Sequence, residues 1–288
     1  MRARKAIWIN GVRAALGLGR GWPSKVMPVL LFIAVITPAV VISIVASQIG
    51  LDDLDLPGHA GYYSMVSVVL ILFAAIIAPE LLCSDRRNRV IDLYLVRPLT
   101  TTDYIAGRWL AFFSVTLALV YIGQIVLLIG LVLASDDPLQ HLQDSWLDIP
   151  RFLGAGVIVA IFITTVPMAV SAFTTRRAYA AAFVIGLFII SFPISAGLTE
   201  CVETERTTAR GTSAQCERPT GDAAKWFTLI DFAQVPAQVN SLIFEESSEP
   251  DTVKLGRELN SGIRIGWYAL LTLGPGLLLW WRYRRIKV

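Results

Sequence analysis

Six long apolar stretches, separated by polar segments, dominate the sequence. Each has roughly the 20 mostly apolar residues that an α-helix needs to cross the hydrocarbon core of a bilayer. We therefore predict an all-α integral membrane protein with six transmembrane helices. The stretches are Met27–Ser47, Tyr63–Cys83, Trp109–Ala134, Leu153–Phe173, Tyr179–Leu198 and Ile263–Trp281.

The composition agrees with a surface that faces lipid. Hydrophobic residues make up 55% of the chain and charged residues 16%, with a mean hydropathy of +0.61. A soluble domain has roughly 45–50% apolar and about 25% charged residues. The apolar stretches leave little room for a separate soluble domain, so we predict one transmembrane domain over residues 1–288.

The polar segments alternate in charge along the chain. Segments 1–26 and 84–108, the turn at Arg176 and Arg177, and the tail after Trp281 are basic, whereas the segments after the first and third stretches are acidic. Basic residues in short loops mark the cytoplasmic side of a membrane. With six spans they all fall on that side, whereas five or seven spans would scatter them. We therefore predict a multi-pass protein of the cell (plasma) membrane with both termini in the cytoplasm.

The basic N-terminal segment 1–26 has helical periodicity of its own. Trp8, Val12, Ala15 and Leu16 recur at helical spacing, and a basic amphipathic helix of this kind lies in the headgroup plane. The alternative is a disordered basic leader. The first apolar stretch is too long for the core of a cleaved signal peptide, so we interpret it as an uncleaved span.

The long segment 199–262 is predicted to lie outside the cell. Its cysteines Cys201 and Cys216 are candidates for a disulfide, because that compartment is oxidising. The stretch Trp226–Phe244 is too interrupted for a span, and we predict short amphipathic helices at the outer interface. Pro236 is expected to kink or end a helix there.

The usual carriers of enzymatic chemistry are missing from the sequence. It contains no Gly-x-x-x-x-Gly-Lys-Ser/Thr phosphate loop, no His-Glu-x-x-His and no Gly-x-Ser-x-Gly. With only His59 and His141, a multi-histidine metal site is excluded. We therefore predict no catalytic residues, no metal site and no cofactor in this chain.

The segment between the second and third stretches has a pattern of its own. Ile91, Tyr94 and Leu95 share one face of a helix by their spacing, and Pro98 disfavours helix at the residue before it. Thr102 is a predicted cap for the following helix. We predict a short amphipathic helix whose exposed apolar face needs a partner or the membrane surface.

This segment resembles the cytoplasmic region of ABC transporter permeases of the type-2 (exporter) class. That family has an acid, a basic pair, a Leu-rich helix, Arg-Pro-Leu, a polar turn and Asp-Tyr-x-x-Gly-Lys/Arg. The chain departs from the pattern at Arg89-Val90, where the family has Gly-Thr. The matching residues are Asp85, Arg86, Arg87, Asp92, Leu93, Leu95, Arg97, Pro98, Leu99, Asp103, Tyr104, Gly107 and Arg108.

The resemblance implies a transport subunit that is not itself an enzyme. Two permease subunits, identical or related, would form the translocation path, with ATP and magnesium bound by two separate ABC ATPase subunits. The other expected partners are membrane lipids, and no nucleic acid is expected. The alternative is a stand-alone membrane enzyme or assembly factor. The implied coupling and ATPase-contact residues are Asp85, Arg86, Arg87, Ile91, Asp92, Tyr94, Leu95, Arg97 and Pro98.

Polar residues inside the apolar stretches complete the set of candidates. Glu80 is the sole acid within a stretch, and such groups are costly and often functional. It has either a structural role, paired with an arginine such as Arg86, or a role in gating. Among uncharged residues, Gln124, Thr164, Thr165 and Ser191 are expected to form hydrogen bonds between helices, with a substrate path as the alternative.

Overall fold

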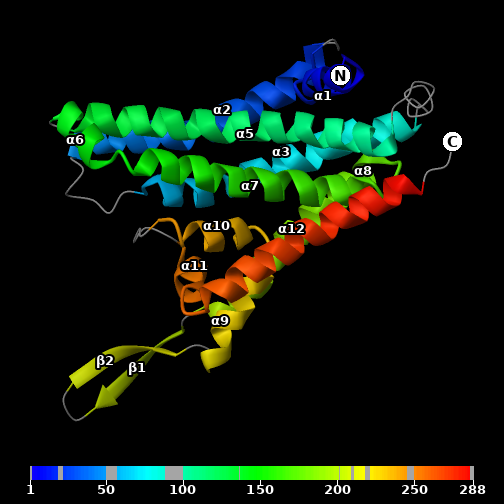
Figure 1. The fold of residues 1–288 in the computed structure, drawn as a ribbon. Helices are drawn as coiled ribbons and strands as arrows, with labels where there is room; N and C mark the ends of the chain where they lie inside the picture. The colour runs from blue at the N-terminus through cyan, green and yellow to red at the C-terminus, as the bar shows by residue number, and fades with distance from the viewer. Residues whose placement is uncertain are drawn as a thin grey trace.

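The computed structural model describes residues 2–18, 22–49, 57–87, 100–135, 137–200, 202–208, 211–217, 221–244 and 250–285. Long helices run side by side through most of the chain (Figure 1). In chain order the helices outside segment 199–262 are α1 (Arg2–Ala15), α2 (Trp22–Ile49), α3 (His59–Arg87), α5 (Thr101–Ala134), α6 (Pro138–Asp144), α7 (Asp148–Ser171), α8 (Arg177–Thr199) and α12 (Ser261–Arg284).

The six apolar stretches all form helices. Among the described residues, six helices are long and apolar enough to cross a membrane, namely α2, α3, α5, α7, α8 and α12. The boundaries differ most in α5, which begins at Thr101 rather than at Trp109 and so takes Arg108 into the helix. The structure therefore fits a multi-pass membrane protein.

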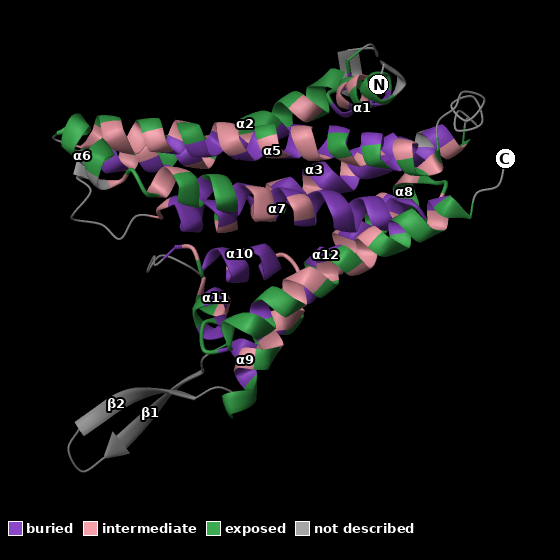
Figure 2. Cartoon of the chain, in the orientation of Figure 1, coloured by how far each residue is buried: buried purple, intermediate pink, exposed green. Residues whose placement is uncertain are grey.

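Two of the six helices form the centre of the bundle. In the most apolar 18-residue stretch of α3 and of α7, 67% of the residues are buried. In the corresponding stretch of each of the other four helices, 28% or fewer are buried. The peripheral helices expose many apolar side chains, such as Leu270, Leu273 and Leu277 of α12, and Figure 2 shows how many residues of α12 are exposed. Exposed apolar area on this scale is stable against lipid chains rather than against water.

One end of the bundle gathers the basic segments. We call it the basic end: α3 and α12 finish there, α5 and α8 begin there, and α1 lies there (Figure 1). The opposite end carries α6 and the start of α3. The basic segments therefore lie at one end of the bundle, as the alternation of charge along the sequence predicts.

The predicted N-terminal helix is present as α1, and its two faces have different surroundings. Ile7 and Ala15 are buried, whereas Trp8 and Leu16 are exposed. The buried stripe faces α5, and Gly11 allows the approach, since a Cβ there would lie 2.5 Å from the Cβ of Ala111. Packing on α5 therefore buries Ile7 and Ala15 and leaves exposed Trp8 and Leu16, two of the residues predicted to face the membrane surface.

Segment 199–262 contains the short helices predicted near Trp226–Phe244, and it also contains strands. β1 (Val202–Thr208) and β2 (Gly211–Glu217) form an antiparallel hairpin that the all-α prediction did not include. After it come η1 (Gly221–Ala223), α9 (Ala224–Phe227), η2 (Thr228–Ile230), α10 (Val235–Asn240) and α11 (Asp251–Gly256). Cys201 of the predicted disulfide lies outside the described residues.

Pro236 sets where α10 begins, and hydrogen bonds from the first turns of α12 hold the short helices in place. Pro236 lies in the first turn of α10, where its missing N–H costs nothing, so it begins a helix rather than kinking or ending one. The indole N–H of Trp267 donates to the Leu229 carbonyl at 2.9 Å. The Arg264 guanidinium donates to the hydroxyl of Ser241 at 2.8 Å. The short helices are thus attached to α12.

Three of the four polar side chains that were predicted to bond between helices form hydrogen bonds to another segment. The fourth, Thr164, is buried, and its hydroxyl has no hydrogen-bond partner among the described residues. Gln124 of α5 pairs with His59 of α3, with 2.6 Å between the side chains. The Thr165 hydroxyl accepts from the Trp109 indole at 3.0 Å, which joins α7 to α5. The Ser191 hydroxyl accepts from the backbone N–H of Phe232 at 3.3 Å. These contacts give the three polar residues a structural role.

A buried carboxyl between η2 and α10 predicts pH-dependent stability. Burial raises the pKa of Asp231 to about 6, against about 3.9 in an unfolded chain. Its proton is therefore held more tightly in the folded state, and stability is lost as the pH rises from about 4 through 6. We expect Asp231→Asn, which keeps an oxygen for the Ala233 N–H, to be more stable than the wild type above pH 7 by about 3 kcal/mol.

The measurement is the free energy of unfolding of both proteins in detergent micelles between pH 4 and 8. The difference between them should shrink to about 0.5 kcal/mol at pH 4, where the carboxyl is protonated in the folded state and about half protonated in the unfolded state. A difference that does not change with pH would contradict the prediction.

Candidate functional site

A buried charge cluster joins the end of α3 to the beginning of α5. Asp85 accepts a hydrogen bond from the hydroxyl of Tyr104 at 2.6 Å and forms an ion pair with Arg108. The Arg108 side chain is 3% exposed. Tyr104 and Arg108 are four residues apart and therefore lie on one face of α5, towards α3. The cluster therefore holds together α3 and α5, the two helices on either side of segment 88–99.

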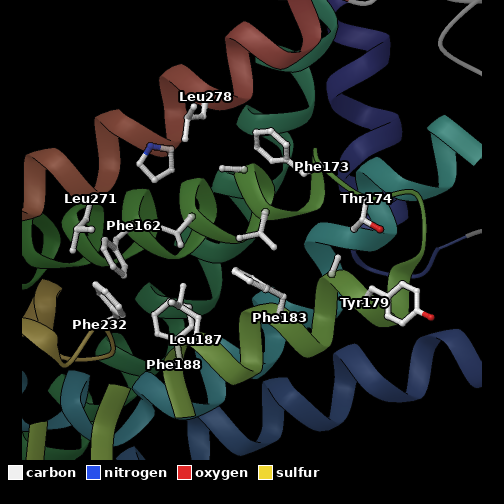
Figure 3. A pocket seen from close by; sticks show the side chains of 15 residues that line it. Phe162, Phe173, Thr174, Tyr179, Phe183, Leu187, Phe188, Phe232, Leu271 and Leu278 are labelled. Atoms are coloured by element: carbon white, nitrogen blue, oxygen red, sulfur yellow. The ribbon is translucent and has the colours of Figure 1, made fainter. Parts of the chain in front are cut away.

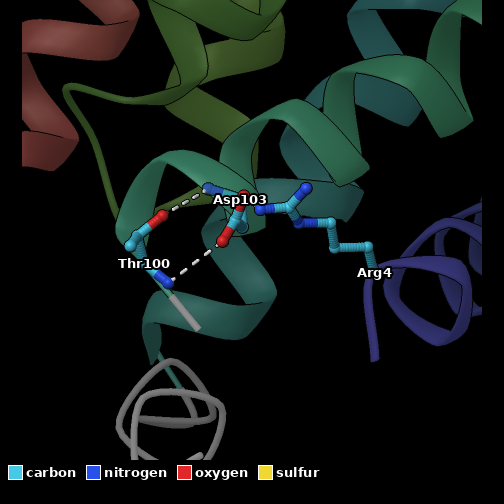
Figure 4. Close-up of polar contacts among 3 residues, drawn as sticks. All are labelled: Arg4, Thr100 and Asp103. Carbon is cyan, nitrogen blue, oxygen red and sulfur yellow. Dashed lines mark hydrogen bonds and ion pairs between the residues drawn. The ribbon is translucent and has the colours of Figure 1, made fainter. Parts of the chain in front are cut away.

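The first turn of α5 is capped by side chains. The Thr100 hydroxyl accepts from the Asp103 N–H at 3.2 Å, and the Asp103 carboxylate accepts from the Thr100 N–H at 3.3 Å (Figure 4). This reciprocal capping box satisfies N–H groups that have no partner within a helix. Thr100 is therefore the cap, and the sequence prediction of Thr102 was wrong. The spacing Thr-x-x-Asp at 100–103 is the signal for it.

Helix α1 is attached to the same turn. Arg4 forms an ion pair with Asp103 at 2.9 Å (Figure 4). One turn further along α5, a Cβ at Gly107 would lie 2.8 Å from Cγ2 of Ile7. A larger residue at position 107 would push α1 away, so glycine is needed there for close packing. The residues Asp103, Tyr104, Gly107 and Arg108 of the recognised pattern thus all have structural partners.

The last turn of α12 completes the packing around Asp85. Tyr283 is buried, and its ring lies 6.2 Å from the ring of Tyr104, between centroids. Aromatic pairs at this distance add stability beyond the area that they bury. The beginning of α5 therefore contacts α1, α3 and α12.

The turn between α7 and α8 is bound to the end of α3. The guanidinium of Arg86 donates to the carbonyl oxygens of Ala172 and, at 3.4 Å, of Thr174. The buried thiol of Cys83 lies 3.4 Å from the same Thr174 carbonyl. Carbonyl groups at a helix end have no partner within the helix, and the Arg86 cation satisfies them.

Glu80 has a different partner from the predicted one. It forms an ion pair with Arg177, in the first turn of α8, whereas Arg86 binds the α7–α8 turn. The Glu80 side chain is 14% exposed and the Arg177 side chain 41%. Because Arg177 is half-exposed, solvent weakens this pair relative to the one at Asp85.

The predicted coupling residues divide between described and undescribed parts of the chain. Asp85 and Arg86 hold helix ends together, and Arg87 is exposed at the end of α3. The predicted short helix and its apolar face lie outside the described residues, so they stay a prediction. These undescribed positions are Ile91, Asp92, Tyr94, Leu95, Arg97 and Pro98.

The structure places in the site four residues that were not among the predicted coupling and gating residues: Tyr104, Arg108, Arg177 and Tyr283. The first two match the family pattern and share a helix face, which was a usable signal. The other two lie far along the chain from their partners, and only folding brings them together.

No protein-family model matches the chain, and no curated protein matches it.

Proposed function

We propose that the chain is the transmembrane permease subunit of an ATP-driven ABC exporter. In this proposal segment 88–99 forms a coupling helix that binds a separate ATPase subunit. The observation that carries the proposal is the buried Asp85–Tyr104–Arg108 cluster, which holds together the two helices from which this segment extends. A segment with both ends held in this way transmits force to the bundle.

The contacts around the cluster support this mechanism. Displacement of segment 88–99 would move α3 and α5 together, because Asp85 and Arg108 are ion-paired. It would also move α1 through Asp103 and Arg4, α12 through Tyr283, and the α7–α8 turn through Arg86. Packed side chains and polar networks of this kind carry coupling between distant sites.

The orientation follows from charge. The basic end is the cytoplasmic end by the positive-inside rule, so segment 88–99 and both termini face the compartment that supplies ATP. The chain has no phosphate loop, so ATP and magnesium bind to the partner. Two permease subunits, identical or related, then form the path across the plasma membrane with two ATPase subunits.

The Glu80–Arg177 pair has a place in the same mechanism. It joins α3 to α8 near the basic end. Any movement that separates α3 from α8 must break it, and a part-buried carboxylate without its cation is costly. We assign gating to this pair rather than to Glu80 alone.

Purification tests the proposal. The chain is extracted from its native membrane in mild detergent, and the proteins that accompany it are identified by mass spectrometry. A stoichiometric protein with a Gly-x-x-x-x-Gly-Lys-Ser/Thr motif and ATPase activity is the expected result. A folded particle that contains this chain without such a protein would instead support a stand-alone membrane protein.

A further inference from the structure

An apolar groove runs along the outside of the bundle between α8 and α12. Both helices pack on α7, which forms the floor of the groove. Its volume is about 560 Å³, within the roughly 300–1,000 Å³ of small-molecule sites. Phe183 of α8 and Leu278 of α12 line it and are exposed, so the groove is open to the side of the bundle. Its ligand is therefore a molecule that reaches it from the membrane.

The groove has the length of one lipid leaflet. Its lining on α7 extends from Phe162 to Val170, which at 1.5 Å per residue is about 12 Å of helix, and it continues past the end of α7 to Phe173 and Thr174. Half of the bilayer core is about 15 Å thick. Phe162, Phe232 and Leu271 line the far end, and Thr174 and Tyr179 lie at the basic end (Figure 3). An acyl chain has the length and the chemistry to follow this groove.

A cation stands at the basic end of the groove. The Arg176 guanidinium lies 5.5 Å from the centre of the Tyr179 ring and donates to the Tyr179 hydroxyl at 3.4 Å. Arg176 is exposed, and among the described residues it has no carboxylate at ion-pair distance. Its neighbour Arg177 is neutralised by Glu80. The local charge at the mouth of the groove is therefore positive.

We propose that this groove binds one anionic phospholipid, with an acyl chain along α7 and the headgroup phosphate at Arg176. Every bilayer lipid offers an acyl chain to an apolar surface, so the tail fixes position and the headgroup supplies selectivity. Basic pockets between transmembrane helices bind anionic headgroups in this way. The inference needs only that the bundle spans a membrane, and it is independent of the ATPase partner.

The headgroup test uses two lipids with the same acyl chains, dioleoyl phosphatidylglycerol and dioleoyl phosphatidylcholine. Their retention by the full chain in detergent is measured by native mass spectrometry. We expect the wild type to retain phosphatidylglycerol about fivefold more tightly, from one basic residue near the headgroup. Arg176→Gln should remove that preference. Arg13→Gln, an exposed arginine on α1 at the same end of the bundle, is the matched control and should keep it.

The tail test fills the groove. Val170→Trp places an indole on its floor and should weaken retention of both lipids severalfold. Leu270→Trp, on an exposed face of α12 away from the groove, is the matched control and should leave retention unchanged. Thermal unfolding in detergent shows whether each variant is folded, and Arg176→Gln, a surface change, tests the proposal by itself.

Three results would overturn the proposal. The first is equal retention of the two lipids by the wild type. The second is an equal loss of preference in Arg176→Gln and Arg13→Gln, which would show general surface attraction. The third is a change of oligomeric mass in Val170→Trp with lipid retention unchanged, which would assign the groove to a second copy of the chain.

Discussion

Asp85→Asn is expected to lower the free energy of unfolding by about 3–5 kcal/mol, the cost of removing one partner from a buried ion pair. Asp85 accepts from both Tyr104 and Arg108, and Arg108 is 3% exposed. Without the carboxylate, the guanidinium charge stays within the protein and cannot regain the water that it gave up on folding. The measurement is unfolding by denaturant in detergent micelles.

Two further variants separate the buried charge from a general loss of contacts. Asp103→Asn is the matched control, since it removes a carboxylate from the same end of the bundle whose partner Arg4 is 68% exposed. Exposed pairs contribute about 0–1 kcal/mol, so this variant should lose little. The double variant Asp85→Asn with Arg108→Met removes both charges and should regain much of the lost stability. Equal losses in Asp85→Asn and Asp103→Asn would contradict the account of the cluster.

If the proposed function is right, the double substitution Ile91→Asp with Tyr94→Asp should abolish binding of the proposed ATPase subunit. In the predicted coupling helix these residues form the apolar face that enters the partner. Apolar and aromatic anchors at the centre of an interface are worth about 2 kcal/mol or more each, so each of the two substitutions lowers the affinity about 30-fold or more. The recovery of ATPase with the purified chain measures the effect.

The control for this experiment adds a carboxylate at the same end without touching the apolar face. Thr102 is exposed in the first turn of α5, where an acidic side chain is favourable for the helix. Thr102→Asp should therefore copurify with the ATPase as the wild type does. Retained association in the Ile91 and Tyr94 variant, with unfolding behaviour like that of the wild type, would refute the coupling helix.

The sequence determined the helices of this protein and the ends at which their charges lie. Uninterrupted apolar stretches have one structure available in a membrane, because a helix satisfies its own backbone hydrogen bonds. The stretch Trp226–Phe244 is too interrupted to span a membrane, and it was correctly predicted to form short helices. The capping box at Thr100 and Asp103 was also readable from local spacing, although the prediction chose Thr102 instead.

Tertiary structure decided which polar groups meet. Glu80 pairs with Arg177 rather than with Arg86, which is closer in the sequence. The reason is that α8 packs alongside α3, while Arg86 donates to carbonyls of the α7–α8 turn. The buried face of α1 was likewise set by the small residues that it meets on α5. The groove exists because α8 and α12 both pack on α7. Each helix follows from the apolar character of its own residues. The partners of polar side chains, and the groove, instead depend on contacts between residues that are distant in the chain.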